Sequence, residues 1–213
     1  MAHVAYFPEH EVDGIKGWYW IETDRQTFGF IKQDWEQTHK EMLFRYMKQF
    51  NKPFGVVVQA GGNLGMYPKI LSKYFGAVYT FEPDPANFYA LSINCNEQHI
   101  FKMQAALDET NRFVQIIHRT QENVGMHQVK PVEPNQLAVP SVMVDQFNVP
   151  QVDLLWLDIE GFEMHALMGA VETIKRCRPL VVCENPQAVE DFMKTLDYKM
   201  YDQSHMDGFF YLE

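Results

Sequence analysis

The sequence has few cysteines and no long apolar run. Its three cysteines, Cys95, Cys177 and Cys183, are an odd number without CxxC spacing, which favours buried free thiols in a reducing compartment over a disulfide framework. No segment approaches the roughly 18 consecutive apolar residues that a membrane helix needs. The first residues lack the basic and then apolar pattern of a secretory signal. We therefore expect a soluble, cytoplasmic globular protein.

Positive charge is also scarce. The 213 residues include 18 Lys and Arg against 28 Asp and Glu, a formal net charge of −10. Because affinity for a phosphate backbone comes largely from positive charge, and no run of Lys or Arg is present, this balance argues against a nucleic-acid partner. The eight histidines show no H-x-x-x-H or similar pairing, so the sequence predicts no metal site.

Apolar residues are abundant enough for one domain. Hydrophobic residues make up 46% of the chain and charged residues 22%, which are globular values. Residues 1–53 differ from the rest, with an aromatic opening followed by helical spacing of apolar residues from Ile31 to Phe50. The aromatic residues are Trp18, Tyr19, Trp20, Phe28 and Phe30. We expect a helical, aromatic N-terminal extension (1–53) packed on a main domain (54–213); a homodimer contact through its apolar face is an open alternative.

From Phe54 onward the pattern alternates between strand and helix. Strands are expected at 54–60, 77–81, 101–105, 113–117, 152–157, 180–183, 198–201 and 209–212, and helices at 66–75, 85–97, 163–177 and 188–196. Repeated strand–helix units predict an α/β fold with a doubly wound, mostly parallel sheet. The last two strands have no helix between them and must pair as an antiparallel hairpin. The polar stretch 119–140 reads as a long loop.

A glycine-rich turn and an acidic residue follow the first two strands of the main domain. In Gln59-Ala60-Gly61-Gly62-Asn63-Leu64-Gly65, glycines allow a tight turn and close approach to a ligand. Glu82 ends the next strand about twenty residues later, where a carboxylate accepts hydrogen bonds from ribose hydroxyls. Together they predict a nucleoside-bearing cofactor. Ala60 breaks the dinucleotide pattern G-x-G-x-x-G, whereas Gly61 to Gly65 has the G-x-x-x-G spacing of S-adenosylmethionine (SAM) methyltransferases.

Several segments resemble the FkbM-type SAM-dependent methyltransferase family. They are residues 57–65, 81–94, 152–170 and 178–184, and the Asp158-Ile159-Glu160-Gly161 element is the most discriminating. The resemblance covers residues 54–185. It implies a seven-stranded Rossmann-like methyltransferase sheet and transfer of a methyl group from SAM, most often to a hydroxyl oxygen of a small molecule or sugar.

The resemblance also implies roles for individual residues. The cofactor-binding set would be Gln59, Gly61, Gly62, Asn63, Gly65, Glu82, Pro83, Ala105, Ala106 and Asp158. In this set Glu82 holds the ribose, and Asp158 lies near the SAM amino group or the acceptor. Position 59 departs from the family pattern, which has Asp or Glu there. Because Gln59 offers no charge to the SAM ammonium, this departure predicts that Gln59→Asp tightens SAM binding.

Transfer to a hydroxyl requires a proton acceptor. Asp158, Glu160 and His165 are the catalytic candidates, with Glu184 as a fourth. Glu160 has a structural alternative, since a carboxylate also favours the start of a helix; His165 could equally be a hydrogen-bonded core residue. In the long loop, Asn123, Gly125 and His127 are candidates for a lid over the site.

Two other functions stay open at this point. One is a non-catalytic, methyltransferase-like module that binds a partner protein, which Gln59 and the unmatched N-terminus keep in view. The other is an NAD-linked oxidoreductase, against which Ala60 counts.

Overall fold

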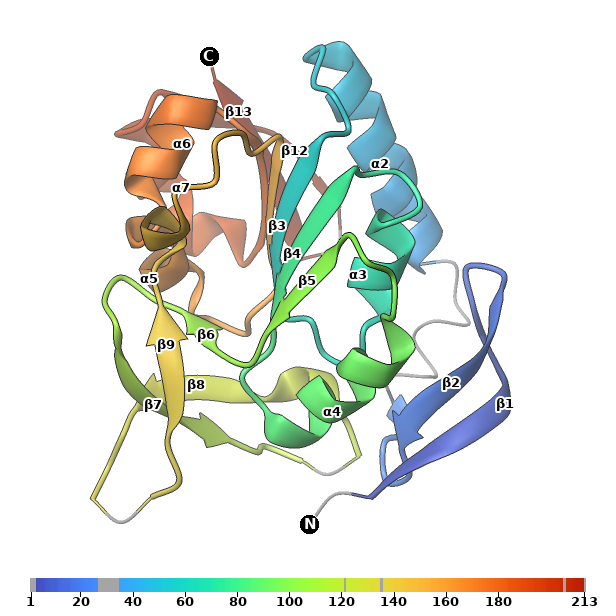
Figure 1. Ribbon diagram of the computed structural model, residues 1–213. Coiled ribbons are helices and arrows are strands. Elements are labelled where there is room, and N and C mark those ends of the chain that lie inside the picture. Colours follow the sequence, from blue (N-terminus) through green and yellow to red (C-terminus); the bar gives the residue numbers. More distant parts are fainter. Residues whose placement is uncertain (1–2, 27–34, 121, 135, 205, 213) are drawn as a thin grey trace.

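A seven-stranded mixed sheet forms the centre of the computed structural model, which describes residues 3–26, 35–120, 122–134, 136–204 and 206–212 (Figure 1). In spatial order its strands are β12 (Tyr198–Ser204), β13 (Asp207–Leu212), β11 (Leu180–Glu184), β10 (Leu154–Leu157), β3 (Val56–Ala60), β4 (Ala77–Phe81) and β5 (Ile100–Met103). The last five are mutually parallel, and β13 runs antiparallel to both β11 and β12. The predicted C-terminal hairpin is therefore confirmed.

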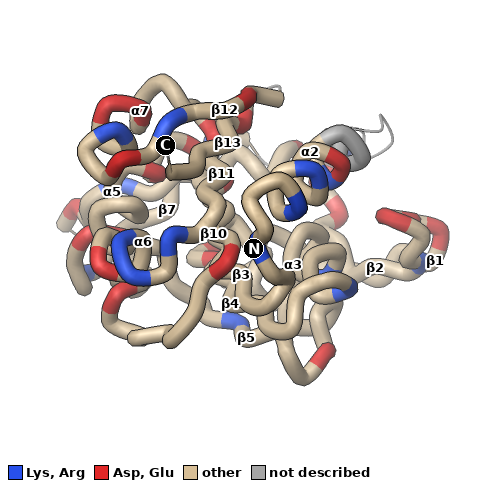
Figure 2. Tube along the Cα trace, turned by 90° about the horizontal axis from the view of Figure 1, so that it is seen from above, with Lys and Arg blue, Asp and Glu red and all other residues tan. Residues whose placement is uncertain are grey.

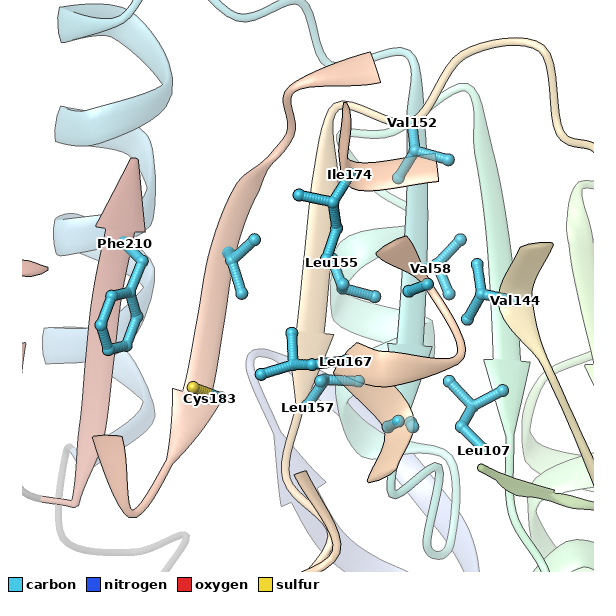
Figure 3. Close-up of a cluster of buried hydrophobic side chains, with 14 of the residues drawn as sticks. Val58, Leu107, Val144, Val152, Leu155, Leu157, Leu167, Ile174, Cys183 and Phe210 are labelled. Carbon is cyan, nitrogen blue, oxygen red and sulfur yellow. The ribbon is translucent and has the colours of Figure 1, made fainter. Parts of the chain in front are cut away.

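Helices cover both faces of this sheet (Figure 1). On one face lie α5 (Glu163–Met168), α6 (Val171–Cys177) and α7 (Pro186–Lys194), and on the other α2 (Trp35–Gln49) and α3 (Met66–Leu71). Successive strand residues alternate between two apolar cores. Val58 and Leu155 belong to the core with α5 and α6 (Figure 3), whereas Val57 and Leu154 belong to the core with α2. This two-sided burial explains the uninterrupted apolar runs of the strands.

The helix predicted at 163–177 is in fact two helices, α5 and α6. The interruption comes from a distant part of the chain, the 3₁₀ helix η2 (Val144–Phe147). There the Asp145 carboxylate accepts hydrogen bonds from the N–H groups of Glu172 (3.0 Å) and Thr173 (2.7 Å). A side-chain cap of this kind starts a new helix at α6. Gly169, at the end of α5, is a local signal for the break, whereas nothing in the local sequence indicates the cap from Asp145.

The N-terminal extension was predicted wrongly in its first half. Residues 4–21 form an antiparallel hairpin of β1 (Val4–Val12) and β2 (Ile15–Ile21), not a helix. The strands are joined by Asp13 and Gly14, which have φ values of 49° and 74°. An Asp-Gly pair favours such a turn, and this signal was overlooked. Helix α2 follows as predicted, while Phe28, Phe30 and Ile31 lie outside the described residues.

The hairpin packs against the main domain. Trp18 and Trp20 are buried in one apolar cluster with Leu64, which precedes α3, and Ile70, which lies in α3. Lys40 on α2 and Lys73 after α3 both pair with Asp13 at 2.6 Å. The extension is thus fixed by apolar and ionic contacts.

A second sheet was not predicted. It has the order β6-β9-β7-β8 and consists of β6 (Ala106–Leu107), β9 (Val139–Val142), β7 (Arg112–Ile117) and β8 (Gln128–Pro131). In Figure 1 it lies beyond the carboxyl ends of the main strands. The loop prediction for 119–140 was wrong for β8 and the start of β9, because Val139 and Val129 pack there against Val114 and Ile116 of β7.

The cysteines and the charges agree with the composition. Cys95, Cys177 and Cys183 are buried and free, as predicted. Figure 2 shows Lys and Arg positions spread over elements such as α2, α6 and β12 instead of gathered on one of them. Within the described residues, none of the helices has the length and apolar character required to cross a membrane.

Candidate functional site

The glycine-rich turn lies at the carboxyl end of β3, between the ends of β4 and β10. The N–H groups of Gly61 and Gly62 donate to the carbonyl oxygen of Phe81, at 3.1 and 3.0 Å. On the other side, a Cβ at Gly61 would lie 1.9 Å from the carbonyl oxygen of Asp158. Gly61 also has a φ of 82°, so this position requires glycine for both its conformation and its close contact.

Gln59 is fully buried, and its side chain bonds the backbone of the glycine-rich turn. Its Nε2 donates to the carbonyl oxygens of Ala60 (3.0 Å) and Gly61 (2.9 Å), and its Oε1 accepts from the Thr80 hydroxyl (2.6 Å). A carboxylate has no N–H to donate and would face two carbonyl oxygens. Gln59→Asp is therefore expected to loosen the turn, the reverse of the expectation drawn from the sequence.

Glu82 connects the turn to the end of β4. Its Oε2 accepts from the N–H of Asn63 (2.7 Å) and its Oε1 from the N–H of Asp84 (2.8 Å). Burial raises the pKa of Glu82 to about 7. The side-chain Oδ1 of Asn63 is shielded from solvent and has no hydrogen-bond partner among the described residues. These two side chains thus offer acceptor atoms that the protein itself does not use fully.

Asp84, beside Glu82, is a buried charged residue that the sequence did not single out. It caps α4 (Pro85–Asn94), since its Oδ1 accepts from the N–H groups of Ala86 (2.8 Å) and Asn87 (3.0 Å). Burial opposes its ionisation, yet the imidazoles of His127 and His118 and the Asn87 N–H together hold the pKa of Asp84 well below its usual range. An Asp before Pro at a helix start was a readable signal for the cap.

A second group of carboxylates stands at the ends of β10 and β11. One carboxylate oxygen each from Asp158, Glu160 and Glu184 lies within 4.8 Å of the others. The N–H of Asp158 donates to the carbonyl oxygen of Ala60 (3.2 Å), which joins this acidic group to the glycine-rich turn. The structure therefore brings together three of the four residues predicted as proton acceptors.

The turn that carries Glu160 is held by hydrogen bonds to the Glu163 side chain. Glu160 and Gly161 have φ values of 55° and 97°. The buried Glu163 carboxylate accepts from the N–H groups of Ile159 and Gly161, both at 3.2 Å. Glu163 at the start of α5 thus has a structural role, and its side chain fixes the direction of the acidic turn.

Burial and mutual repulsion make these carboxylates basic. Burial, with the charges of Asp207 and Glu184, raises the pKa of Asp158 well above its ordinary value. Burial and the charge of Glu160 raise the pKa of Glu184 to about 7. Burial and the charge of Glu163 raise the pKa of Glu160. A carboxylate with a pKa near neutrality is suited to accept a proton at physiological pH.

Asp207 forms a buried pair with His39. The Nε2 of His39 lies 2.7 Å from Oδ2 of Asp207, and the two side chains are 0% and 4% exposed. Because His39 lies on α2 and Asp207 begins β13, the N-terminal extension reaches the same edge of the sheet as the acidic group. This pairing was not predictable, since only the fold brings the two segments together.

The remaining predicted residues lie around these two groups of carboxylates or farther away. His165 stacks on Phe162 (4.3 Å between ring centroids), and its Nδ1 lies 3.5 Å from Oε1 of Glu109. Ala105 and Ala106 are buried after β5, and Pro83 is half-buried between Glu82 and Asp84. Asn123, Gly125 and His127 lie in and around the 3₁₀ helix η1 (Val124–Met126), and their role as a lid stays a prediction.

Comparison with protein families gives one assignment. A family model described as the methyltransferase FkbM domain matches residues 59–207. No curated protein sequence matches the chain significantly.

Several solved structures are similar to the chain. The methyltransferase FkbM from Methylobacillus flagellatus KT has a TM-score of 0.53 and 17% identity, covering 76% of this chain and 43% of that one. The precorrin 8W decarboxylase from Methanobacterium thermoautotrophicum has a TM-score of 0.48 and 10% identity, covering 81% and 89%. A putative methyltransferase from Streptococcus mutans, solved with SAH, has a TM-score of 0.43 and 11% identity, covering 73% and 85%. At 17% identity, the similarity to the M. flagellatus structure shows the fold alone. The chain spans less than half of that protein's length.

Proposed function

The chain belongs to the FkbM methyltransferase family, and we propose that it transfers a methyl group from SAM to a hydroxyl oxygen of a small molecule or sugar. The observation that carries the proposal is the arrangement of Glu82 and Asn63. Glu82 accepts hydrogen bonds from the N–H of Asn63 in the glycine-rich turn and from the N–H of Asp84, two residues beyond Glu82 itself. Among the described residues, the buried Oδ1 of Asn63 has no hydrogen-bond partner.

The residues present fit the cofactor. An ionised carboxylate has about four acceptor sites, and Glu82 uses one per oxygen on backbone N–H groups, so acceptor capacity remains for two ribose hydroxyls. The unpartnered Oδ1 of Asn63 suits the cationic methionine part of the cofactor. SAM, when bound, supplies a methyl group already activated on a positively charged sulfur. The chain must then hold the acceptor in line and take its proton.

We assign the proton acceptance to Asp158. Its backbone is joined to the glycine-rich turn, and its carboxylate has a raised pKa. As the new oxygen–carbon bond forms, the acceptor's hydroxyl proton passes to this carboxylate, while Glu160 and Glu184 increase its basicity by repulsion. His165, which lies beside Asp108 and Glu109, has no part in the proposal. The acidic surroundings disfavour a polyanionic acceptor such as nucleic acid.

Isothermal titration calorimetry with SAM and with its demethylated product, S-adenosylhomocysteine (SAH), tests the cofactor assignment. We expect both to bind, and Glu82→Gln to weaken SAM by about 10- to 100-fold, because a charged hydrogen-bond acceptor contributes roughly 1.5–3 kcal/mol. Glu172→Gln, an exposed change on α6, is the matched control and should leave affinity unchanged. Absence of SAM binding, or equal affinity in Glu82→Gln, would contradict the proposal.

Release of SAH over a panel of hydroxyl-bearing sugars and glycosides tests the reaction. Asp158→Asn should lower SAH formation by about 10²- to 10⁴-fold while SAM still binds, as expected for loss of a general base. SAM binding without SAH formation on any panel member would favour the non-catalytic module. The family match favours methyl transfer over the NAD-linked oxidoreductase, and NAD serves as the negative control ligand.

A further inference from the structure

Asp84, His118 and His127 form a cluster next to the proposed cofactor site. The Nε2 of His118 lies 2.7 Å and the Nδ1 of His127 3.4 Å from the same Oδ2 atom of Asp84. One potential ligand atom from each residue lies within 4.8 Å of the others, and the two imidazole rings are 4.4 Å apart. Two imidazole nitrogens and one carboxylate oxygen therefore converge on a single point.

The cluster is held in place by bonds that do not use the converging atoms. Oδ1 of Asp84 is occupied by the N–H groups of Ala86 and Asn87, which directs Oδ2 toward the histidines. The Nδ2 of Asn87 donates to the carbonyl oxygen of Val124 (3.2 Å), so α4 also fixes the segment that leads into His127. This second shell resembles the supporting bonds that orient metal ligands in general.

One of the converging atoms is held only loosely. Nδ1 of His127 is shielded from solvent, and its partner in the described part of the chain is Oδ2 of Asp84 at 3.4 Å, which is long for a hydrogen bond. The His127 side chain is 13% exposed, whereas that of His118 is 57% exposed. The cluster thus has a closed side and a side open to solvent.

We propose that Asp84, His118 and His127 bind a divalent first-row transition metal, of which Zn²⁺ is the best fit. Imidazole nitrogen and carboxylate oxygen are common zinc ligands, and bonds of about 2.0–2.2 Å place tetrahedral ligand atoms roughly 3.3–3.6 Å apart. The 3.4 Å separation already matches, and His118 has to move by about half an ångström. Mg²⁺ and Ca²⁺ prefer oxygen ligands, so two imidazoles disfavour them.

The surroundings suit a dication. His127 lies within electrostatic reach of Glu82 and Glu160, both of which are carboxylates at the edge of the main sheet. Three protein ligands leave a fourth position for water. This site could not be read from the sequence, because the histidines lack a helical spacing and Asp84 is 34 residues away from His118.

The site joins the end of β4 to the second sheet. Asp84 follows Glu82 by two residues, His118 directly follows β7, and His127 lies between η1 and β8. A metal here would fasten that segment to the start of α4, at one end of the cofactor site. The metal site itself does not depend on methyl transfer.

Calorimetric titration of the full chain with ZnCl₂, after treatment with a chelator, tests the proposal. We expect one Zn²⁺ per chain, no comparable signal with MgCl₂, and the visible absorption bands of tetrahedral Co²⁺ when CoCl₂ replaces zinc. His118→Ala and His127→Gln should each lower Zn²⁺ affinity more than ~10-fold. Thermal unfolding of each variant, together with SAM titration, shows whether it is folded.

The matched control is His165→Gln, which removes the histidine of a second group, Asp108, Glu109 and His165. Zn²⁺ affinity should be unchanged in this variant. Absence of Zn²⁺ binding by the unaltered chain, or binding lost in His165→Gln but kept in His127→Gln, would overturn the proposal. Zn²⁺ binding in a chain that fails to bind SAM would leave the metal site standing and refute the proposed function.

Discussion

The carboxylates after β4 and those after β10 and β11 lie along the same edge of one sheet, yet their surroundings are opposite. Glu82 and Asp84 receive backbone N–H groups, and Asp84 also has two histidines. Asp158, Glu160 and Glu184 mainly face one another. Backbone donors fix the direction of a carboxylate so that it can hold a ligand, and crowding by other carboxylates raises the pKa. Mainly through burial, the pKa of Glu82 is also raised to about 7, so the two groups differ in their neighbours more than in their basicity. We call Glu82 and Asp84, with the glycine-rich turn, the binding half of this edge, and Asp158, Glu160 and Glu184 its basic half.

The difference originates in how each strand leads into its helix. After β4, helix α4 starts within four residues and its free N–H groups are available to Asp84. After β10, the chain first makes the turn at Glu160 and Gly161, and the first acid of α5, Glu163, is used to hold that turn. In the basic half a backbone hydrogen bond from Glu160 lowers the pKa of Glu184, but burial and the neighbouring carboxylates raise it by more.

Gly61→Ala should have the largest effect, because Gly61 lies between the end of β4 and Asp158, where the two halves meet. The added Cβ would collide with the Asp158 carbonyl oxygen at an unfavourable φ. We expect a loss of about 3 kcal/mol or more in the free energy of unfolding, measured by urea denaturation, and loss of SAM binding. Gly14→Ala is the control: its φ is 74°, nothing lies within 4 Å, and the cost should be about 1 kcal/mol. Similar losses in both variants would show that contact between the halves is unimportant.

Gln59→Glu should damage the binding half alone. The new carboxylate would face the carbonyl oxygens of Ala60 and Gly61 without a proton to donate at neutral pH. Unpaired buried groups of this kind cost roughly 2 kcal/mol. Denaturation at pH 7 together with SAM titration should show lower stability and weaker binding. A tighter complex would restore the view that position 59 faces the SAM ammonium.

The sequence predicted the parallel core and the glycine-rich turn better than the rest of the molecule. Continuous apolar runs and the glycine-rich turn are local signals, and each matched an observed strand or turn. The second sheet, the cap from Asp145 and the pair of His39 with Asp207 depend on contacts between distant segments. Such contacts leave no periodic pattern in one sequence. The β1–β2 hairpin is different, because Asp13-Gly14 was a readable signal that the helical interpretation overlooked.

Glu184→Gln should remove part of the pH dependence of stability that arises in the basic half. The folded-state pKa of Glu184 is raised from 4.5 to about 7, so the native state holds a proton that the unfolded state releases earlier. The unaltered chain should therefore lose stability as pH rises from about 4.5 to 7, and the variant should not share this loss. Since Glu184 is partly exposed, we expect a gain of only about 1 kcal/mol at pH 8, or roughly 2–4 °C in Tm.

Thermal unfolding of both chains at pH 4.5 and pH 8 measures this effect. The difference in Tm should be larger at pH 8. The matched control is Glu172→Gln, whose exposed carboxylate should give the same difference at both pH values. A Glu184→Gln difference that does not change with pH would mean that the carboxylates of the basic half do not repel one another.

The side chain of Asn94 at the end of α4 connects the β1–β2 hairpin to the glycine-rich turn. Its Oδ1 accepts from the N–H of Tyr19 (2.8 Å), and its Nδ2 donates to the carbonyl oxygens of Tyr19 (2.8 Å) and Leu64 (2.7 Å). The Asn94 amide thereby bonds both backbone groups of Tyr19, as a residue of a paired strand would, and it also bonds the glycine-rich turn. The amide proton of Tyr19 should consequently exchange with deuterated solvent only when that turn opens, although it belongs to a terminal hairpin that would otherwise fray.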